Sequence, residues 1–414
     1  MSLANPEASA ALTLLSAKAV RERAHCMLAI GLDGRLPNFR IDLDRLDGAV
    51  DLVLETTRNA YPSFEVPFHS RWRHFVTDGD NRWAAVAERA DWPDRAARAR
   101  AEFDLAIVSV FLDAGAGPSW RYRDPKTGSA IGRSEGLGLA SLAMFSAGAF
   151  SASSLEPLRA DADTLGRLSV ADIERGMQVS AANPLIGTDG RADLLRRLGQ
   201  LVASKPEIFG SCDTPRPGGL FDRLAMLAEG GKLPAPMILT ELLQQFGPIW
   251  PSRLTLGGIA LGDCWRHPAL ITADATSGLV PLHKLSQWLA YSLIEPLQTS
   301  GIDVTDIDGL TGLAEYRNGG LFVDTGVLAF RNAEDAQREH EVASPLVVEW
   351  RALTVALLDR LADGVRHRLG RDATSMPLAK ILEGGTWATG RRLARERRAD
   401  ASPPVKVVSD GTVF

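Results

Sequence analysis

The segment GLTGLAEYRNGGLFVDTGVL, residues 309–328, places an acid and a base next to a pair of glycines. Glu315 and Arg317 flank Tyr316. A solvated surface helix would explain the charges, but each glycine loosens a helix by roughly 1 kcal/mol relative to alanine. A partly buried carboxylate beside a basic group stays ionised and could stabilise a cationic transition state or orient a water. A structural ion pair between Glu315 and Arg317 is the alternative interpretation.

A second group of candidate residues follows an apolar run in VFLDAGAGPSWRYRD, residues 110–124. A carboxylate at the end of such a run, here Asp113, can accept hydrogen bonds from sugar hydroxyls. The small residues after it would let a ligand approach the backbone, and Trp120 could stack on that ligand. Arg121 and Arg123 add positive charge. The alternative is a turn capped by aspartate, with a surface aromatic residue beside it.

Two further segments carry candidate side chains. In LHKLSQW, residues 282–288, Lys284 lies on a helical pattern, where a lysine usually faces solvent. Because the pattern is strongly apolar and His283 is adjacent, partial burial of Lys284 is the alternative. In GDCWRHP, residues 262–268, Cys264 and His267 have a metal-like spacing. Two ligands are weak evidence for a metal, so we expect a packed cysteine and a hydrogen-bonded histidine. We retain Asp263 and His267 as candidate substrate-binding residues and predict no metal site.

Composition and missing motifs exclude several classes of protein. The net charge of −5 gives no electrostatic footprint for nucleic acid, and the basic run 391–398 is interpreted as a solvated helix face. The sequence contains no P-loop, dinucleotide-binding fingerprint, H-E-x-x-H, C-x-x-C or G-x-S-x-G motif. Three widely spaced cysteines fit a reducing compartment. We expect a cytoplasmic protein without a signal peptide, membrane span or cofactor.

The elements that position these residues are predicted to be mainly helices. Apolar residues recur at intervals of three and four in 191–206, 220–231, 282–297 and 349–370. We expect the third helix to end at Pro296, and the fourth to be capped by Gly370. The run 106–115 fits a strand or a buried helix. A short hairpin is expected from 254–265 and 268–274.

The whole-chain prediction is a mainly α-helical, compact multi-helix fold with a few short strands. We expect residues 1–414 to form a single catalytic unit, with two lobes that would divide near 155–165. Residues 399–414 are expected to be a C-terminal tail that packs on the body or frays.

Five stretches together resemble one protein family. They are GLDGRLPNF (31–39), SRWRHF (70–75), the segment 110–141, GLAEYRNGGLFVDTGVL, and the terminal run from 381 to 414. By these stretches the chain is identified as a member of the fungal and bacterial uracil-catabolism family that is the fourth protein of the Urc pathway. This resemblance implies a pathway that opens the pyrimidine ring of a uracil ribonucleotide, passes through a ribosylated urea species and yields urea.

A second, more distant resemblance is to the queuosine-salvage nucleotide N-glycosidases, which have a helical DNA-glycosylase-like core. Their aspartate-ended apolar run, their helix with a lysine, and their acidic-Tyr-Arg triplet match segments of this chain in the same order. The resemblance implies ligand contacts for Asp113 and Trp120, and functional roles for Lys284, Tyr316 and Arg317. The acid of the triplet is aspartate in those enzymes and Glu315 here.

These resemblances imply an N-glycoside hydrolase that releases urea from ribosylurea, with or without a 5′-phosphate. Glu315 would stabilise positive charge at the anomeric carbon and activate the attacking water. Lys284 or an ordered water would protonate the departing urea. Asp113 would bind ribose, and Arg121, Arg123 or Arg317 would hold a phosphate. The expected partner is this small molecule, without nucleic acid or a membrane, and the oligomeric state is left open. Two alternatives are a hydrolase of an earlier ring-opened ureide, with Cys264 as nucleophile, and a non-catalytic binding protein.

Overall fold

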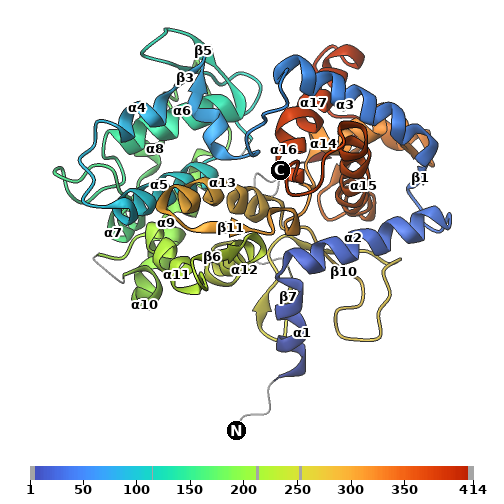
Figure 1. The fold of residues 1–414 in the computed structure, drawn as a ribbon, viewed down its shortest axis with the longest axis horizontal. Helices are drawn as coiled ribbons and strands as arrows, with labels where there is room; N and C mark the ends of the chain where they lie inside the picture. The colour runs from blue at the N-terminus through green and yellow to red at the C-terminus, as the bar shows by residue number, and fades with distance from the viewer. Residues whose placement is uncertain (1–4, 114, 211–213, 251–253, 409–414) are drawn as a thin grey trace.

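The computed structural model describes residues 5–113, 115–210, 214–250 and 254–408, and it confirms a mainly α-helical fold (Figure 1). Cys212 and residues 409–414 lie outside the described residues. The longer helices carry the core: α2 (Ala17–Leu32), α3 (Leu46–Ala60), α5 (Arg95–Phe111), α6 (Arg133–Ser146), α9 (Thr188–Ser204), α12 (Ala235–Phe246), α13 (Lys284–Ser300), α15 (Pro345–Leu369) and α17 (Trp387–Arg397).

Shorter helices and turns connect them. The short α-helices are α1 (Pro6–Leu14), α4 (Arg82–Ala87), α7 (Ala162–Gly166), α8 (Val170–Gly176), α10 (Pro206–Phe209), α11 (Leu220–Leu227), α14 (Tyr316–Asp324) and α16 (Leu378–Ile381). The tighter turns are η1 (Leu43–Arg45), η2 (Arg71–Phe75), η3 (Pro217–Gly219), η4 (Gly247–Ile249), η5 (Ile307–Gly309) and η6 (Ala333–Ala336), and η7 (Leu382–Thr386) is a π-helical turn.

The strands are short and pair two by two. Five pairs are antiparallel: β1 (Phe39–Ile41) with β12 (Leu328–Phe330), β2 (Val76–Thr77) with β3 (Asp80–Asn81), β4 (Tyr122–Arg123) with β5 (Ala130–Ile131), β7 (Thr255–Leu256) with β8 (Ile259–Ala260), and β9 (Cys264–Arg266) with β10 (Leu279–Pro281). Two pairs are parallel: β6 (Lys232–Pro234) with β11 (Asp303–Thr305), and β13 (Glu339–Glu341) with β14 (Lys406–Val408).

Two sequence expectations about these elements are corrected by the structure. The hairpin lies within 254–265 as β7 and β8, and β9 pairs with β10 rather than with 268–274. The helix α13 continues through Pro296 to Ser300. Proline cannot donate a hydrogen bond to the carbonyl four residues earlier, which is that of Ser292. The indole N–H of Trp72 donates to this carbonyl at 2.7 Å, so the interruption leaves no unpaired group there.

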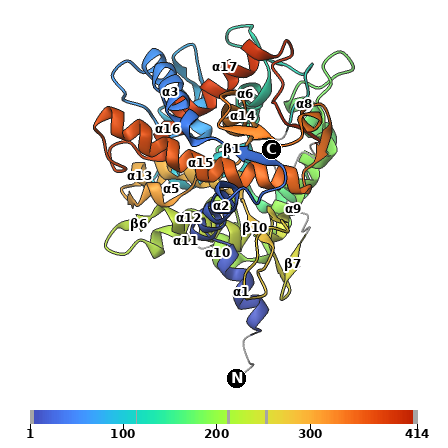
Figure 2. The same ribbon diagram turned by 90° about the vertical axis from the view of Figure 1, so that its right-hand side faces the viewer.

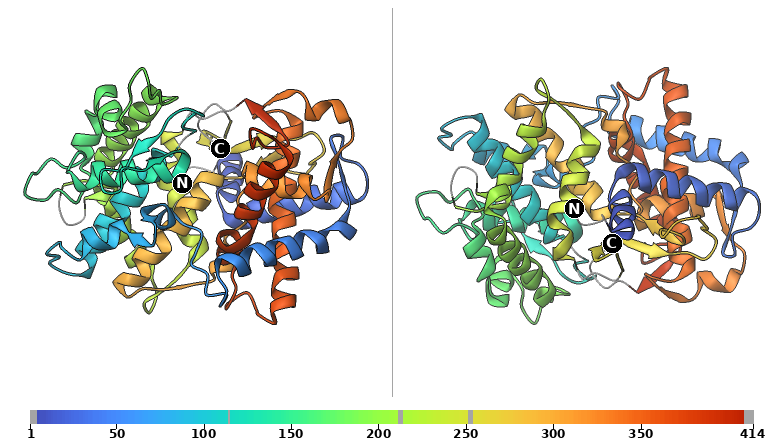
Figure 3. Two further views of the ribbon diagram at one scale, coloured as in Figure 1. Left: turned by 90° about the horizontal axis from the view of Figure 1, so that it is seen from above. Right: turned by 90° about the horizontal axis from the view of Figure 1, so that it is seen from below.

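The core is built around α5, α13 and α15. Helix α5 packs along α13, and α15 packs against α2, as Figures 1 and 2 show. One continuous cluster of buried apolar side chains includes residues from Leu15 to Val405. Seen from above and below, elements from the middle of the chain lie on one side, and the N- and C-terminal parts lie together on the other (Figure 3). The single catalytic unit and the lobe boundary near 155–165 stay predictions.

The glycine-rich start of α14 allows this helix to pack unusually close to its neighbours. A Cβ on Gly319 would lie 2.6 Å from the indole of Trp350 in α15. A Cβ on Gly390 in α17 would lie 2.1 Å from the carbonyl oxygen of Arg317. Both separations are shorter than carbon atoms tolerate, so glycine is required for the contacts of α14 with α15 and α17.

The described part of the C-terminal segment, residues 399–408, packs on the body of the molecule. Val405 is fully buried, and β14 pairs with β13. Arg398 donates two hydrogen bonds of 2.6 and 2.7 Å to the carboxylate of Asp324 in α14. The segment is therefore attached to α14 at its start and to β13 at its end. Across the four described ranges, no helix has both the length and the apolar character needed to span a bilayer.

Candidate functional site

A cavity of about 420 Å³ lies where the first residues of α6, α13 and α14 meet the turn after α5. Its volume falls within the roughly 300–1,000 Å³ typical of small-molecule sites. Five of the residues singled out in the sequence line it together: Asp113, Lys284, Glu315, Tyr316 and Arg317. These residues come from three segments that are far apart in the chain, so their meeting depends on the tertiary structure.

Glu315 lies at the N-cap of α14 and is buried. Its Oε2 accepts a hydrogen bond of 2.8 Å from the backbone N–H of Arg317, and its Oε1 accepts one from the N–H of Asn318. Burial raises the pKa of Glu315, whereas these backbone bonds and the charge of Lys284 act to lower it. Each carboxylate oxygen keeps a second lone pair. Capping the helix therefore leaves Glu315 able to accept a proton or to face a cationic carbon.

Lys284 is the first residue of α13, and Asp263 holds this end of the helix. The carboxylate of Asp263 accepts the backbone N–H of Lys284 at 3.0 Å and two hydrogen bonds of 2.8 Å from Arg351. Burial lowers the pKa of Lys284, and the charges of Glu315 and Asp113 raise it. The ammonium group makes no ion pair within the part of the chain that the structure describes. Lys284 therefore presents its positive charge to the cavity and to both carboxylates.

Asp113 is fixed by a buried arginine. Arg71 donates from Nη1 to Asp113 Oδ2 at 2.6 Å and from Nε to the hydroxyl of Ser109 at 2.6 Å. Burial lowers the pKa of Arg71, while the neighbouring Asp113 raises it. The second oxygen of Asp113 accepts no hydrogen bond from any described residue. It is therefore available to a ligand hydroxyl.

His74 lines the cavity close to this pair. Its Nδ1 lies 3.1 Å from Nη1 of Arg71. Because a guanidinium can only donate, Nδ1 acts as the acceptor and the ring proton sits on Nε2. Burial and the charge of Arg71 lower the pKa of His74 to about 4. His74 is therefore a neutral hydrogen-bond donor near pH 7.

Three arginines line the same cavity and differ in how their charge is balanced. Arg391 pairs with Glu135 at 2.7 Å. Arg317 donates to the carbonyl of Ala401 at 3.0 Å and has no carboxylate partner among the described residues. Arg133, the first residue of α6, makes no hydrogen bond or ion pair in those residues and adopts a positive φ of 57°. The positive charges of Arg133 and Arg317 are thus available to an anionic ligand.

Three residues expected to contact ligand lie elsewhere. Trp120 is fully buried in the core, where its indole donates to the carbonyl of Met177 at 2.9 Å. Arg121 and Arg123 are exposed and bond to neighbouring loop residues. They fail to reach the cavity because the chain after Pro118 turns away into β4. Of the four residues predicted from this segment, Asp113 lines the cavity and the other three do not.

Asp263 and His267 also lie outside the cavity lining. Asp263 contacts the cavity only indirectly, because its carboxylate accepts the backbone N–H of Lys284. His267 is fully buried with its Nε2 3.4 Å from a carboxylate oxygen of Glu349. Cys264 is buried in an apolar cluster, and burial strongly raises the pKa of its thiol. Helices α15 and α2 pack on β9 and β10, which separates these three side chains from the cavity.

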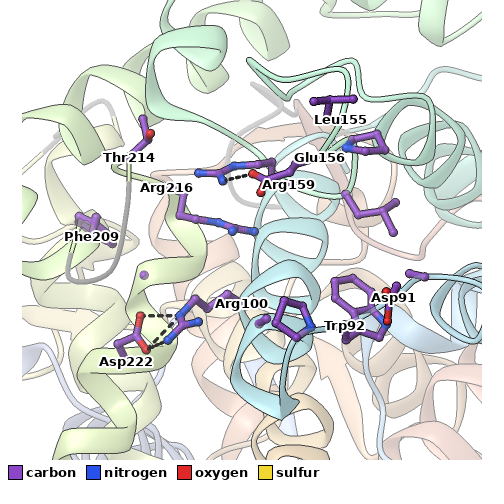
Figure 4. Close-up of a pocket in the computed structure, with 16 residues that line it drawn as sticks. Asp91, Trp92, Arg100, Leu155, Glu156, Arg159, Phe209, Thr214, Arg216 and Asp222 are labelled. Carbon is purple, nitrogen blue, oxygen red and sulfur yellow. Dashed lines mark hydrogen bonds and ion pairs between the residues drawn. The ribbon is translucent and has the colours of Figure 1, made fainter.

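A second cavity, of about 540 Å³, lies beside α5 and α11 (Figure 4). It also contains arginines, but each one described here has a carboxylate partner. Arg100 binds Asp222 at 2.8–3.1 Å, and Arg216 binds Asp104 at 2.8 Å. Arg159 binds Asp161 at 2.7 Å. Each of these arginines is therefore paired with a carboxylate, whereas Arg133 and Arg317 of the first cavity have no carboxylate partner among the described residues.

Sequence reasoning missed several residues of the first cavity or its wall, among them His69, Arg71, His74 and Arg133. Three of them lie in or next to SRWRHF, a stretch used for the family resemblance but not examined for chemistry. An arginine and two histidines clustered within six residues are the signal that could have identified it. Arg133 carries no such local signal.

The comparisons with known proteins agree on one family. A family model described as "Protein of unknown function (DUF1688)" matches residues 13–414. The Schizosaccharomyces pombe protein named Protein urg3 is 37% identical over 409 residues, which cover 97% of this chain and 98% of the relative. Uracil catabolism protein 4 of Lachancea kluyveri is 36% identical over 416 residues, covering 92% of this chain and 93% of the relative.

Proposed function

Because this chain belongs to the DUF1688 family and has Uracil catabolism protein 4 among its relatives, we propose that it acts in uracil catabolism as an N-glycoside hydrolase. The proposed substrate is ribosylurea carrying a 5′-phosphate, and the products are urea and the sugar phosphate. The observation that supports this proposal most directly is the cavity that Asp113, Lys284 and Glu315 line together.

In this proposal, Glu315 is the group beside the anomeric carbon. An oxocarbenium-like transition state develops positive charge that a carboxylate stabilises. The pKa of Glu315 is raised by burial, which makes the carboxylate a better proton acceptor for the attacking water. Two backbone N–H groups hold it in place, so little reorganisation is needed during the reaction.

Asp113 and His74 are proposed to bind the ribose. Asp113 offers a carboxylate oxygen that accepts hydroxyl protons, and neutral His74 offers an N–H that donates to a hydroxyl oxygen. Lys284 supplies positive charge opposite both carboxylates, and this charge acts against the rise in the pKa of Glu315 that burial causes. Without that charge, two carboxylates facing one cavity would disfavour each other's ionised form.

The phosphate is proposed to bind between Arg133 and Arg317. Neither has a carboxylate partner in the described residues. Burial lowers the pKa of Arg317, and the charge of Arg133 lowers it further, as expected for two nearby cations. A phosphate dianion would relieve this repulsion and can accept several N–H donors. Arg121 and Arg123, expected from the sequence as alternatives, lie outside the cavity.

The test is a urea-release assay. Purified protein is incubated with ribosylurea 5′-phosphate and, separately, with ribosylurea. We expect release that falls at least about 100-fold in Glu315→Gln, the range for loss of an acid–base group. Asp94→Ala is the matched control, because Asp94 caps α5 by accepting the N–H of Ala97 at 2.7 Å far from the cavity. It should lose stability but keep activity.

Absence of urea release from either substrate, with folded wild-type protein, would contradict the proposal. Binding of ribosylurea 5′-phosphate without turnover would favour the non-catalytic alternative. The thiol-dependent ureide hydrolase is disfavoured by Cys264, because its buried sulfur has a raised pKa and lies outside the cavity lining. A nucleophilic cysteine needs the opposite environment.

A further inference from the structure

One pair of residues at the cavity is not used by the proposed mechanism. His69 lines the cavity, and its Nδ1 lies 2.7 Å from Oε2 of Glu383. The imidazole is 10% exposed and the Glu383 carboxylate 18% exposed. Glu383 is not among the described residues that line the cavity, so the imidazole is the member of the pair that is exposed to it. Nδ1 is taken by Glu383, and Nε2 makes no hydrogen bond with any described residue, so Nε2 is the ring nitrogen available to a ligand.

The fold fixes both members of this pair. The backbone N–H of His69 donates to the carbonyl of Ala379 at 2.9 Å. Glu383 lies in the π-helical turn η7, a conformation that is rare and is frequently found at functional sites. The turn packs tightly on α3, since a Cβ on Gly385 would lie 2.4 Å from Val53. The imidazole is therefore oriented by the backbone on one side and by the carboxylate on the other.

The position of His69 relative to Glu315 matches a need of the reaction. His69 and Glu315 both line this cavity, so both can reach one ligand bound there. Urea is a poor leaving group, and the nitrogen that departs must receive a proton. A histidine with a carboxylate at Nδ1 is suited to this step, because the carboxylate sets the tautomer and stabilises the imidazolium.

We propose that His69, oriented by Glu383, is the proton donor to the leaving urea nitrogen. This inference rests on the proposed function. The C1–N bond breaks, its electron pair stays on nitrogen, and nitrogen takes the proton from His69 Nε2. Water forms the new C1–O bond and gives a proton to Glu315. After release of the products, solvent returns a proton to His69 and removes one from Glu315, so the cycle is balanced.

Lys284, the donor expected from the sequence, has a different role in this arrangement. Its charge acts on Glu315 and Asp113, and no side chain among the described residues accepts a hydrogen bond from its ammonium group. Its removal should disturb both carboxylates, and therefore the cleavage of any riboside. Loss of His69 should matter only where the leaving group needs a proton.

The test compares two substrates with different leaving groups. Ribosylurea 5′-phosphate needs protonation, whereas 4-nitrophenyl riboside 5′-phosphate has a leaving group that departs as the anion. We expect His69→Gln to lower kcat/KM for the urea substrate by about 100- to 10,000-fold and for the nitrophenyl substrate by less than about 10-fold. Glu315→Gln should lose both activities.

Glu383 is tested as a positioning residue. Glu383→Gln should lower kcat for the urea substrate while KM stays the same, and Glu383→Asp should recover part of the loss. The matched control is His25→Gln, since His25 also pairs with a carboxylate, that of Asp359 at 2.8 Å, away from the cavity. It should leave both activities unchanged.

Two results would overturn the inference, and they differ. If wild type cleaves both substrates and His69→Gln lowers both equally or neither, His69 is not the donor and the proposed function stands. If folded wild type cleaves neither substrate, the proposed function fails and this inference fails with it.

Discussion

The guanidinium of Arg71 donates a 2.6 Å hydrogen bond to the carboxylate of Asp113, and neither side chain is more than 5% exposed. Removing one member of a buried pair leaves an uncompensated charge, which costs roughly 3–5 kcal/mol. Asp113→Asn should therefore lower the free energy of unfolding by about that amount, as measured by urea denaturation.

The control is an ion pair at the surface. Asp33 and Arg35 are joined at 2.9 Å, but both side chains are more than 60% exposed. Asp33→Asn should change the unfolding free energy by less than about 0.5 kcal/mol. If both substitutions lowered the free energy of unfolding by the same amount, burial of the Arg71–Asp113 pair would not explain the loss of stability.

His74 makes stability depend on pH. Its pKa is lowered to about 4 in the folded protein, from an ordinary value of 6.5. Between pH 4 and pH 6.5 the unfolded chain binds more protons than the folded one. The contribution of His74 to the free energy of unfolding is therefore complete above pH 6.5 and is lost as the pH falls through about 4. The loss should be at most roughly 3 kcal/mol. His74→Gln should flatten the curve of unfolding free energy over this range, and an unchanged slope would contradict the assignment.

Arg133 should determine preference for a phosphorylated substrate. Arg133→Gln removes a cation that has no ion-pair partner in the described residues, so KM for ribosylurea 5′-phosphate should rise about 10-fold or more. KM for ribosylurea should stay nearly the same, because it offers no charge to Arg133. Arg123→Gln is the control, since Arg123 is exposed and outside the cavity. A rise of KM for both substrates would argue against a phosphate contact.

Cys264 should not contribute to catalysis. It is fully buried, and burial raises the pKa of its thiol, whereas Cys26 is exposed. Cys264→Ala should keep urea release within about three-fold of wild type and should lower stability by the amount typical of a small core truncation. Loss of activity in a variant whose fold is intact by circular dichroism would restore the thiol mechanism.

Much of the helical fold was predictable because helices that pack on a core carry apolar residues at regular intervals of three and four. Helix α9 buries one face and exposes another, and α15 does so after Leu358, so their apolar spacing is visible in the sequence. Gly370 caps α15 with a φ of 61° as expected. The run 106–111 was ambiguous because it lies in a part of α5 that is buried all round. The pairing of β9 with β10 was missed because the two strands are joined by the loop 267–278. The apolar residues of this loop show no regular spacing that would predict how it brings the strands together.

Part of the candidate site was visible for a different reason. Asp113, Lys284 and Glu315 were singled out because their side-chain types suit sugar chemistry and their segments resemble known glycosidases. Trp120 has the same kind of local context as Asp113 but points into the core. The sequence could not distinguish them, because the direction of a side chain after a turn is set by what packs against it.

Sequence by itself determined the class of fold, the family and the chemical types present in the cavity, because periodicity, composition and motifs are local properties of the chain. Tertiary structure alone decided which of those side chains meet. It paired Asp113 with Arg71, joined Asp263 to the backbone of Lys284, and joined His69, which lines the cavity, to Glu383. Each of these contacts joins residues that are distant in the chain and held by packing, and no local pattern encodes that.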